Sequence, residues 1–128
     1  MTYYMSKMVS GTFDEAVEKV KASLIAEGFG IITEIDVKAT LKTKLDVDFR
    51  PYKILGACNP QFAYRALTAE DKIGTMLPCN VVVQQVSAGE VEIAAIDPVA
   101  SMKAVENPQL QEIAHTIRAK LKSAVDSL

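Results

Sequence analysis

The residues whose types and spacing come closest to chemistry are two cysteines, each followed by asparagine. Cys58 stands in Gly-Ala-Cys-Asn-Pro and Cys79 in Leu-Pro-Cys-Asn-Val. The pair Asn59-Pro60 is typical of a helix start, because asparagine is a good N-cap and proline suits the first helical position. The Cys58 sulfur is therefore expected near the positive end of a helix, which favours thiolate over thiol. The competing interpretation is a small core cysteine at a strand end.

The two Cys-Asn pairs fall at the ends of predicted strands, and two such ends could meet. If the Cα atoms lie within about 7 Å, the thiols could cycle with a disulfide or share a soft metal ion. The separation of Cys58 from Cys79 is not that of a CxxC motif, so the redox signal is weak. A structural zinc site needs four ligands, and two cysteines with His115 do not suffice. We expect no metal and no cofactor.

His115 is the single histidine of the chain, and helical spacing places it beside Arg118 and Lys122 on a polar helix face. It is predicted to be an exposed surface residue. The sequence contains no Gly-rich phosphate loop, no Gly-x-Ser-x-Gly elbow and no nucleotide-binding fingerprint. No complete catalytic constellation can be assembled, so enzymatic activity is left open with Cys58 and Cys79 as the candidate catalytic residues.

Two carboxylates form a further candidate cluster. Glu34 and Asp36 are predicted on one strand face with Lys38 just beyond, and paired carboxylates can divide acid and base roles. A solvated sheet face with a salt bridge is the more common outcome. Lys44 either neutralises the carboxylates, meets an anionic ligand or faces solvent.

Capping residues, prolines and glycines divide the chain into segments whose apolar spacing predicts a series of strands and helices. A Thr12-x-x-Glu15 capping box starts the first helix and Gly28 ends it. Asp36 is predicted to cap a short helix, and three Asx-Pro pairs predict helix starts near residues 60, 98 and 108. The strands are predicted over residues 3–10, 31–37, 52–58, 79–86 and 91–96. The fold class is α+β, with one mostly antiparallel sheet.

Within this sheet, the last two strands are predicted to form a hairpin with Gly89 at its tight position. If Val86 faces Val91, this register sets Asn80 opposite Asp97. Ile31, Thr33, Ile35 and Val37 are expected on one face of the second strand. Gly56, inside the third strand, is predicted where another backbone or a ligand approaches closely.

Composition limits the classes of protein to which the chain belongs. With 128 residues, 49% hydrophobic and 23% charged, it is an ordinary globular sequence and is expected to fold as a single domain over residues 1–128. The formal net charge of −2 disfavours nucleic acid and anionic membranes as partners. No leader-like or membrane-spanning apolar segment is seen, so a cytoplasmic protein is the default expectation.

Four runs of the sequence, taken in order, resemble domain-of-unknown-function family 302: residues 27–37, 52–60, 77–83 and 97–98. The resemblance implies a TATA-binding-protein-like β-α-β(4)-α layout, with a long helix packed across one sheet, and chains that pair as dimers. It implies no DNA binding. The family's pattern falls on Glu34, Asp36, Lys44, Gly56, Cys58, Asn59, Pro60, Pro78, Cys79, Asn80 and Asp97.

These observations support three hypotheses. The first is a homodimeric module that binds a small molecule or a partner, with Glu34, Asp36, Lys44, Cys58, Asn59, Cys79, Asn80 and Asp97 as candidate ligand-binding residues. The second is a thiol-dependent redox or sulfur-handling protein, in which Cys58 attacks and Cys79 resolves. The third is a purely structural role for both Cys-Asn motifs, in packing and helix capping. Dimerisation is also expected because Val81, Val82 and Val83 present apolar side chains on both faces of their strand.

Overall fold

Residues 2–128, described in a computed structural model, contain one sheet of five antiparallel strands. The strands lie in the order β1-β5-β4-β3-β2, and every neighbouring pair is antiparallel. Their bounds are β1 Tyr4–Ser10, β2 Gly30–Asp36, β3 Tyr52–Cys58, β4 Cys79–Ser87 and β5 Glu90–Ile96. The strand positions agree with the sequence predictions to within a residue or two.

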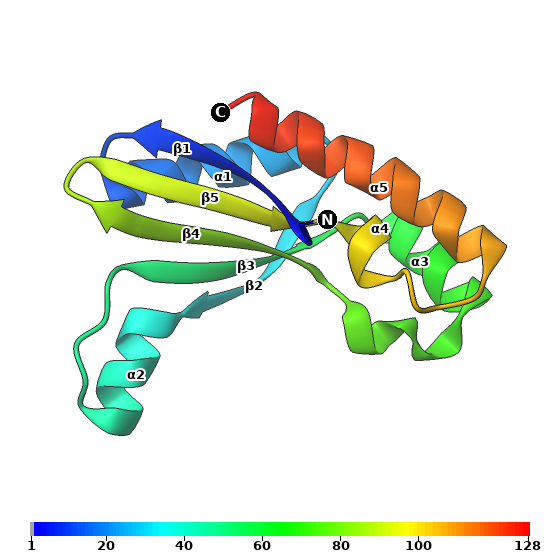
Figure 1. The fold of residues 1–128 in the computed structure, drawn as a ribbon, viewed down its shortest axis with the longest axis horizontal. Helices are drawn as coiled ribbons and strands as arrows, with labels where there is room; N and C mark the ends of the chain where they lie inside the picture. The colour runs from blue at the N-terminus through cyan, green and yellow to red at the C-terminus, as the bar shows by residue number, and fades with distance from the viewer. Residues whose placement is uncertain (1) are drawn as a thin grey trace.

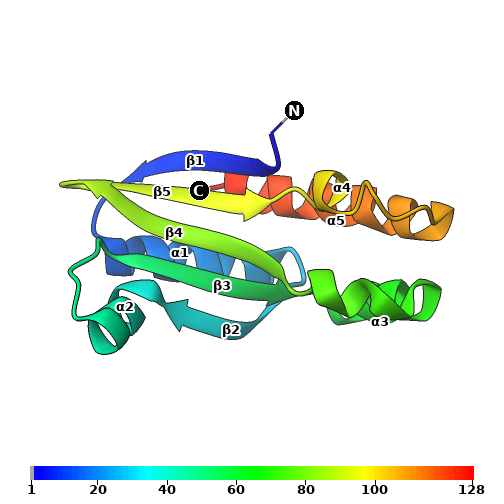
Figure 2. The same ribbon diagram turned by 60° about the horizontal axis from the view of Figure 1, so that its bottom comes forward.

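Two long helices cover one face of the sheet. They are α1 (Phe13–Ala26) and α5 (Pro108–Asp126), and both lie behind the strands in Figure 2. Shorter elements gather beyond one end of the sheet, and α2 (Val37–Leu45) projects at the other end (Figure 1). The gathered elements are α3 (Pro60–Ala69), the 3₁₀ helix η1 (Asp71–Met76) and α4 (Pro98–Ser101). The α+β class is confirmed, and the β-α-β(4)-α order holds once these short helices are set aside.

The core lies between the sheet and the two long helices. Alternate residues of β4 and β5 point to the helices and are fully buried, whereas their neighbours point to the opposite, open face. Helix α5 meets them with a stripe of buried residues at spacings of three and four. Each large aliphatic side chain buried in this way contributes about 1.5–3 kcal/mol. The core is therefore specified by the two-residue alternation of the strands and by the three- and four-residue spacing of apolar residues in α5.

Four of the five predicted N-cap residues make a capping hydrogen bond through their side chains, and Asn59 is the exception. Thr12 accepts a hydrogen bond from the Glu15 backbone N–H, and Asp36 caps α2 through the N–H of Ala39. Asp97 and Asn107 cap α4 and α5 in the same way. Gly28 takes a positive φ of 89° after α1, as a C′ glycine should. The 3₁₀ helix η1 was not predicted.

The predicted hairpin register is wrong by one residue. Gln85 pairs with Val91 and Ser87 with Glu90, so a bulge at Val86 displaces the pairing. Val81 consequently pairs with Ala95, and Asn80 lies level with Ile96 instead of Asp97. Asn80 alternates with the buried Cys79 and Val81 of its own strand and therefore points to the open face.

A second bulge changes the predicted faces of β2. Ile31 pairs with Ala57 but Thr33 pairs with Gly56, which leaves Ile32 as the extra residue. Ile31 therefore faces the helices, whereas Thr33 and Ile35 face the opposite side. The prediction that these three residues share a face is wrong.

Thr33 of β2 and Pro78, the residue before β4, pack closely over Gly56 of β3. A side-chain Cβ built on Gly56 would overlap Thr33 Oγ1 and would lie 2.7 Å from Pro78 Cγ. The close approach expected at this glycine is thus made by the protein's own side chains.

None of the helices within residues 2–128 has the length and apolar character needed to cross a membrane.

Replacing Gly56 with alanine is expected to lower the free energy of unfolding by about 1–3 kcal/mol, because Thr33 and Pro78 must move to admit the methyl group. Gly30 is the matched control, since its added Cβ would be 3.9 Å from the nearest atom, the Cys58 backbone oxygen. Gly30→Ala is expected to change stability by no more than about 0.5 kcal/mol. Urea unfolding of both variants measures the difference, and equal stabilities would contradict the steric account.

Candidate functional site

A cavity of about 260 Å³ lies at the end of the sheet where β3 ends and β4 begins. The short helices α3 and α4 and the N-terminal half of α5 enclose it, so the chain contributes to it from five separate regions (Figure 1). Its walls are almost entirely hydrocarbon. The lining residues are Phe29, Ile32, Ala57, Cys58, Asn59, Phe62, Ala63, Ala66, Leu67, Leu77, Pro78, Cys79, Pro98, Met102, Ile113, Ala114 and Ile117.

Helix α3 presents one face to this cavity. Phe62, Ala63, Ala66 and Leu67 line it, at the spacings of three and four that place residues on one side of a helix. Two of the four are alanines, and Ala114 of α5 and Ala57 of β3 also line the cavity. Larger side chains at these inward positions would fill the space, so the cavity follows from small residues at core-facing positions.

The structure brings Cys58 and Cys79 to the wall of this one cavity. Ala57 pairs with Cys79 across β3 and β4, and Cys58 is the next residue, which sets the two cysteine Cα atoms roughly 6 Å apart. Both thiols are free. Cys58 is half-buried and Cys79 is 8% exposed. Burial, together with the neighbouring Cys58 thiol, raises the pKa of Cys79 to about 11. Cys79 is therefore a protonated thiol at neutral pH.

Asn59 stands at the N-cap of α3, yet its side chain makes no capping hydrogen bond. It lines the cavity instead, and its Nδ2 is the atom nearest to a Cβ built on Gly28, at 3.2 Å. The prediction that Asn59 caps this helix is thus wrong for its side chain. The arrangement leaves a half-buried amide, able to donate and to accept, at the edge of an otherwise apolar space.

Asp97 is used within the fold. Its Oδ1 caps α4, and its Oδ2 accepts a 2.9 Å hydrogen bond from Arg118 Nε of α5. The residue is 8% exposed, and the cavity is lined by its neighbour Pro98. Asn80 lies on the open face of the sheet, outside the cavity. The structure does not bring Asn80 and Asp97 together.

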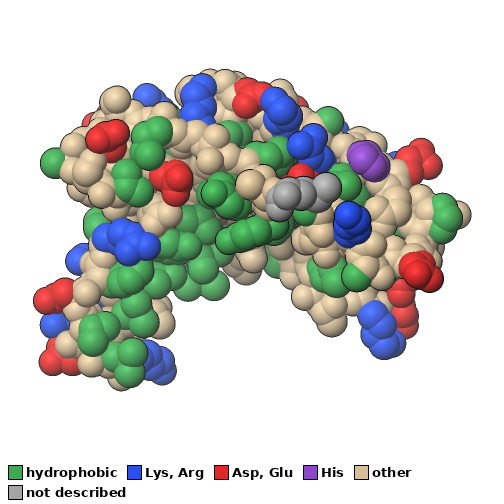
Figure 3. Space-filling view, in the orientation of Figure 1, with side chains coloured by type: hydrophobic (Ala, Val, Ile, Leu, Met, Phe, Trp, Pro, Cys, Tyr) green, Lys and Arg blue, Asp and Glu red, His purple; other side chains and the backbone are tan. Residues whose placement is uncertain are grey.

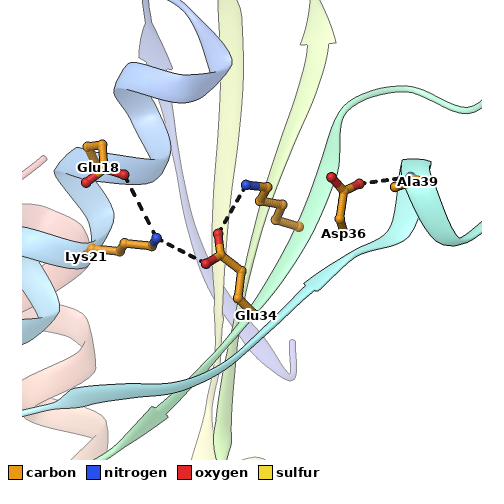
Figure 4. A network of polar contacts seen from close by, with 6 residues as sticks. Glu18, Lys21, Glu34, Asp36 and Ala39 are labelled. Atoms are coloured by element: carbon orange, nitrogen blue, oxygen red, sulfur yellow. Dashed lines mark hydrogen bonds and ion pairs between the residues drawn. The ribbon is translucent and has the colours of Figure 1, made fainter.

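Glu34, Asp36 and Lys44 lie away from the cavity and from one another's charged groups. Glu34 pairs with Lys21 of α1 and with Lys53 of β3, each at 3.1 Å. Figure 4 shows Lys21 reaching towards Glu34. Hydrogen bonds from Lys53 and Lys21 lower the pKa of Glu34, which keeps it a carboxylate at neutral pH. Asp36 caps α2, and Lys44 is an exposed residue of that helix.

No metal-binding cluster of the ordinary kind is present among residues 2–128: no three His, Cys, Asp or Glu side chains gather in a suitable way. His115 is exposed, as its helical position predicted. Of the sequence-predicted site residues, Cys58, Asn59 and Cys79 line the cavity and the other five do not.

Sequence reasoning missed the cavity itself, together with Met102, Phe29 and Phe62 in its wall. The apolar stripe of α5 could be identified from the sequence, but such a stripe does not reveal where the residues packed against it are too small to fill the core. The available signal was alanine at inward helical positions, as at Ala63 and Ala66.

The chain is similar to known proteins in both sequence and structure. The family model "Domain of unknown function DUF302" matches residues 5–128. A crystal structure of an uncharacterized conserved protein DUF302 from Bacillus stearothermophilus superposes with a TM-score of 0.90 at 34% sequence identity, over 98% of this chain and 98% of that one. No curated protein matches the sequence significantly.

The pKa of Cys79 predicts slow alkylation of this thiol. In a Cys58→Ser variant at pH 8, iodoacetamide is expected to modify Cys79 about 100-fold more slowly in the folded protein than in urea, since a thiol with a pKa of about 11 is scarcely ionised there. The rate should rise with pH towards 11. Mass spectrometry measures the modification, and equal rates in folded and unfolded protein would contradict the burial of this thiol.

Proposed function

We propose that this chain, which belongs to the family of domains of unknown function DUF302, is a homodimeric module that binds a small apolar molecule in the cavity beside Cys58 and Cys79. The observation that carries the proposal is a preformed cavity of about 260 Å³ with hydrocarbon walls. Ligand pockets of proteins are typically concave and mostly apolar, with a few polar groups that fix orientation.

The chemistry of the wall sets the class of ligand. Aromatic and aliphatic side chains from α3, α4 and α5 favour a ring or a short branched hydrocarbon, whose transfer from water contributes about 25 cal/mol per Å². Asn59 supplies an amide that does not cap its own helix. A ligand with one carbonyl or hydroxyl group satisfies this amide, whereas a charged ligand would face an uncompensated cost of burial.

The dimer is proposed to form through the open face of the sheet. Side chains that alternate with the core residues make this face, and they surround a shallow depression lined by Tyr3, Tyr4, Tyr52, Asn80, Val82, Gln84, Glu92, Ala94 and Ile96. Figure 3 shows hydrophobic side chains gathered in the hollow between the two lobes of the molecule. Half-buried Val82 supports the need for a cover on this side of β4.

The area of this face sets how much of the molecule a dimer must bury. Five strands of about seven residues, at about 4.8 Å by 3.3 Å per residue, give roughly 550 Å². A standard interface buries about 800 Å² on each partner. Helix α2 projects away from α1 and α5 (Figure 1). Leu45 at its end is 66% exposed, and Val47 in the loop that follows is 43% exposed. The sheet face alone is smaller than this area, so the proposed dimer also needs the exposed apolar side chains near α2 in its interface.

A thiol-dependent redox or sulfur-handling role is the second candidate, favoured by two free thiols on one cavity wall. The raised pKa of Cys79 weighs against this candidate, because a buried protonated thiol is a poor nucleophile. A purely structural role for both Cys-Asn motifs is the weakest of the three, since Asn59 makes no cap.

The two unbridged cysteines support a cytoplasmic location for the protein.

Filling the cavity is expected to abolish ligand binding. Ala63→Phe places a ring inside the space, and the affinity for the neutral dye N-phenyl-1-naphthylamine, measured by fluorescence, should fall at least about tenfold. Ala119→Phe, at an exposed position of α5, adds the same ring outside the cavity and should leave the affinity unchanged. A wild-type protein that does not bind the dye, or an unaffected Ala63→Phe variant, would contradict the proposed binding role.

A charge on the open face is expected to dissociate the dimer. Ala94 pairs with Val82 and Ser6 on this face, so Ala94→Lys should place a long side chain and its ammonium in the interface, at a cost in packing and desolvation. Analytical ultracentrifugation should give the wild type twice the chain mass of 13.9 kDa and the variant the mass of one chain. Ala119→Lys is the control on the helical side. A monomeric wild type at high concentration would refute the dimer.

A further inference from the structure

We propose that residues 60–76, which form α3 and η1, are a lid over the cavity, and that Asn107 at the start of α5 holds this lid closed. The inference rests on the proposed binding role of the cavity, because it assigns the step by which a ligand enters and leaves. Helix α3 lies beyond the end of β3 (Figure 2), where one of its faces forms a wall of the cavity. The strand ends, α4 and α5 supply the other walls.

The lid leaves the sheet and returns to it at neighbouring positions. It follows Cys58, the last residue of β3, and it precedes Cys79, the first residue of β4, by only Leu77 and Pro78. Ala57 pairs with Cys79 across these two strands, so both ends of the lid are fixed at the same edge of the sheet. A segment attached in this way can swing as a unit away from the cavity that it covers.

Few interactions join the lid to the rest of the molecule. Within the described chain, no backbone hydrogen bond runs from residues 60–76 to a residue outside 59–77. Ala66 and Ile73 are the buried side chains of this segment, and its other residues are half-buried or exposed. Segments with few buried contacts and no backbone hydrogen bonds to their neighbours open at a lower free energy than the core does.

Asn107 makes the polar contacts that tie the lid to the body of the protein. Its Nδ2 donates to the backbone oxygen of Ala69 at 2.8 Å and to Glu70 Oε1 at 3.3 Å, and we call these two hydrogen bonds the latch. The other side-chain hydrogen bonds and the ion pair of the lid join residues within it, over the part of the chain that the structure describes. The latch therefore fixes the far end of α3 to the first turn of α5.

The latch can be removed without removing a helix cap. The Oδ1 atom of Asn107 accepts backbone N–H groups of the first turn of α5, and aspartate is an equally good N-cap. Aspartate has no N–H donor, and its second oxygen would face the Ala69 carbonyl and the Glu70 carboxylate. Asn107→Asp is therefore expected to release the lid while α5 keeps its cap.

A lid predicts faster exchange of the ligand at an unchanged affinity. The latch is present whether the cavity is empty or occupied, so its loss weakens the closed state equally in both. Stopped-flow fluorescence with N-phenyl-1-naphthylamine measures the two rate constants. In Asn107→Asp, the association and dissociation rate constants are each expected to rise at least about fivefold, with Kd changed less than about twofold.

Two further variants separate the latch from a general loss of stability. Adding Glu70→Gln to Asn107→Asp supplies an amide that donates to the new carboxylate, and both rate constants should return towards those of the wild type. Thr12→Ala removes the N-cap of α1, outside the lid and the cavity wall, and should leave both rate constants unchanged. Unchanged rates in Asn107→Asp, or an equal rise in Thr12→Ala, would overturn the lid.

Hydrogen exchange measured by mass spectrometry tests the lid without any ligand. Peptides within residues 60–76 should exchange at least about fivefold faster in Asn107→Asp than in the wild type, whereas peptides of α1 should not change. Equal acceleration in both segments, or none in the lid, would contradict the inference. A wild type that shows this local difference but binds no dye would refute the proposed binding role and still support the lid.

Discussion

The antiparallel pairing of β3 with β4 at Gly56 is the constraint on which the rest of this molecule depends. Because Gly56 has no side chain, Thr33 from β2 and Pro78 from the approach to β4 close over it. This contact fixes three strands in one register and sets Ala57 opposite Cys79. Both cysteines reach the sheet end together for this reason, and the chain leaves β3 directly into α3 as one wall of the cavity.

The cavity beyond this point exists because small residues meet there. Ala57, Ala63, Ala66 and Ala114 face one another from β3, α3 and α5, and none of them is large enough to close the gap. Elsewhere the same helix α5 packs densely, since Leu121 and Val125 meet large aliphatic side chains of α1 and the sheet. An apolar void costs stability in proportion to its volume. A chain that keeps four alanines at one inward location forgoes that stability, which is consistent with a space kept open for an occupant.

Local signals in the sequence were sufficient for most elements and insufficient for the pairing between them. Thr12, Asp36, Asp97 and Asn107 cap helices as their types predict, because a cap depends on three or four adjacent residues. The bulges at Ile32 and Val86 depend on the neighbouring strands, so the alternation of hydrophobic residues within one strand does not predict them. The candidate site was accordingly half predictable: Cys58, Asn59 and Cys79 were found from motif and strand position, whereas Met102 arrives through tertiary packing.

The alternation of side chains in β4 separates the two proposed roles of the protein. Cys79 turns towards the cavity on the helical side, and its neighbour Asn80 turns to the open face. A second copy seated on the open face would therefore leave α3, α4 and α5 uncovered around the cavity. The cavity and the face proposed for the dimer are therefore connected only through the backbone of the strands that separate them.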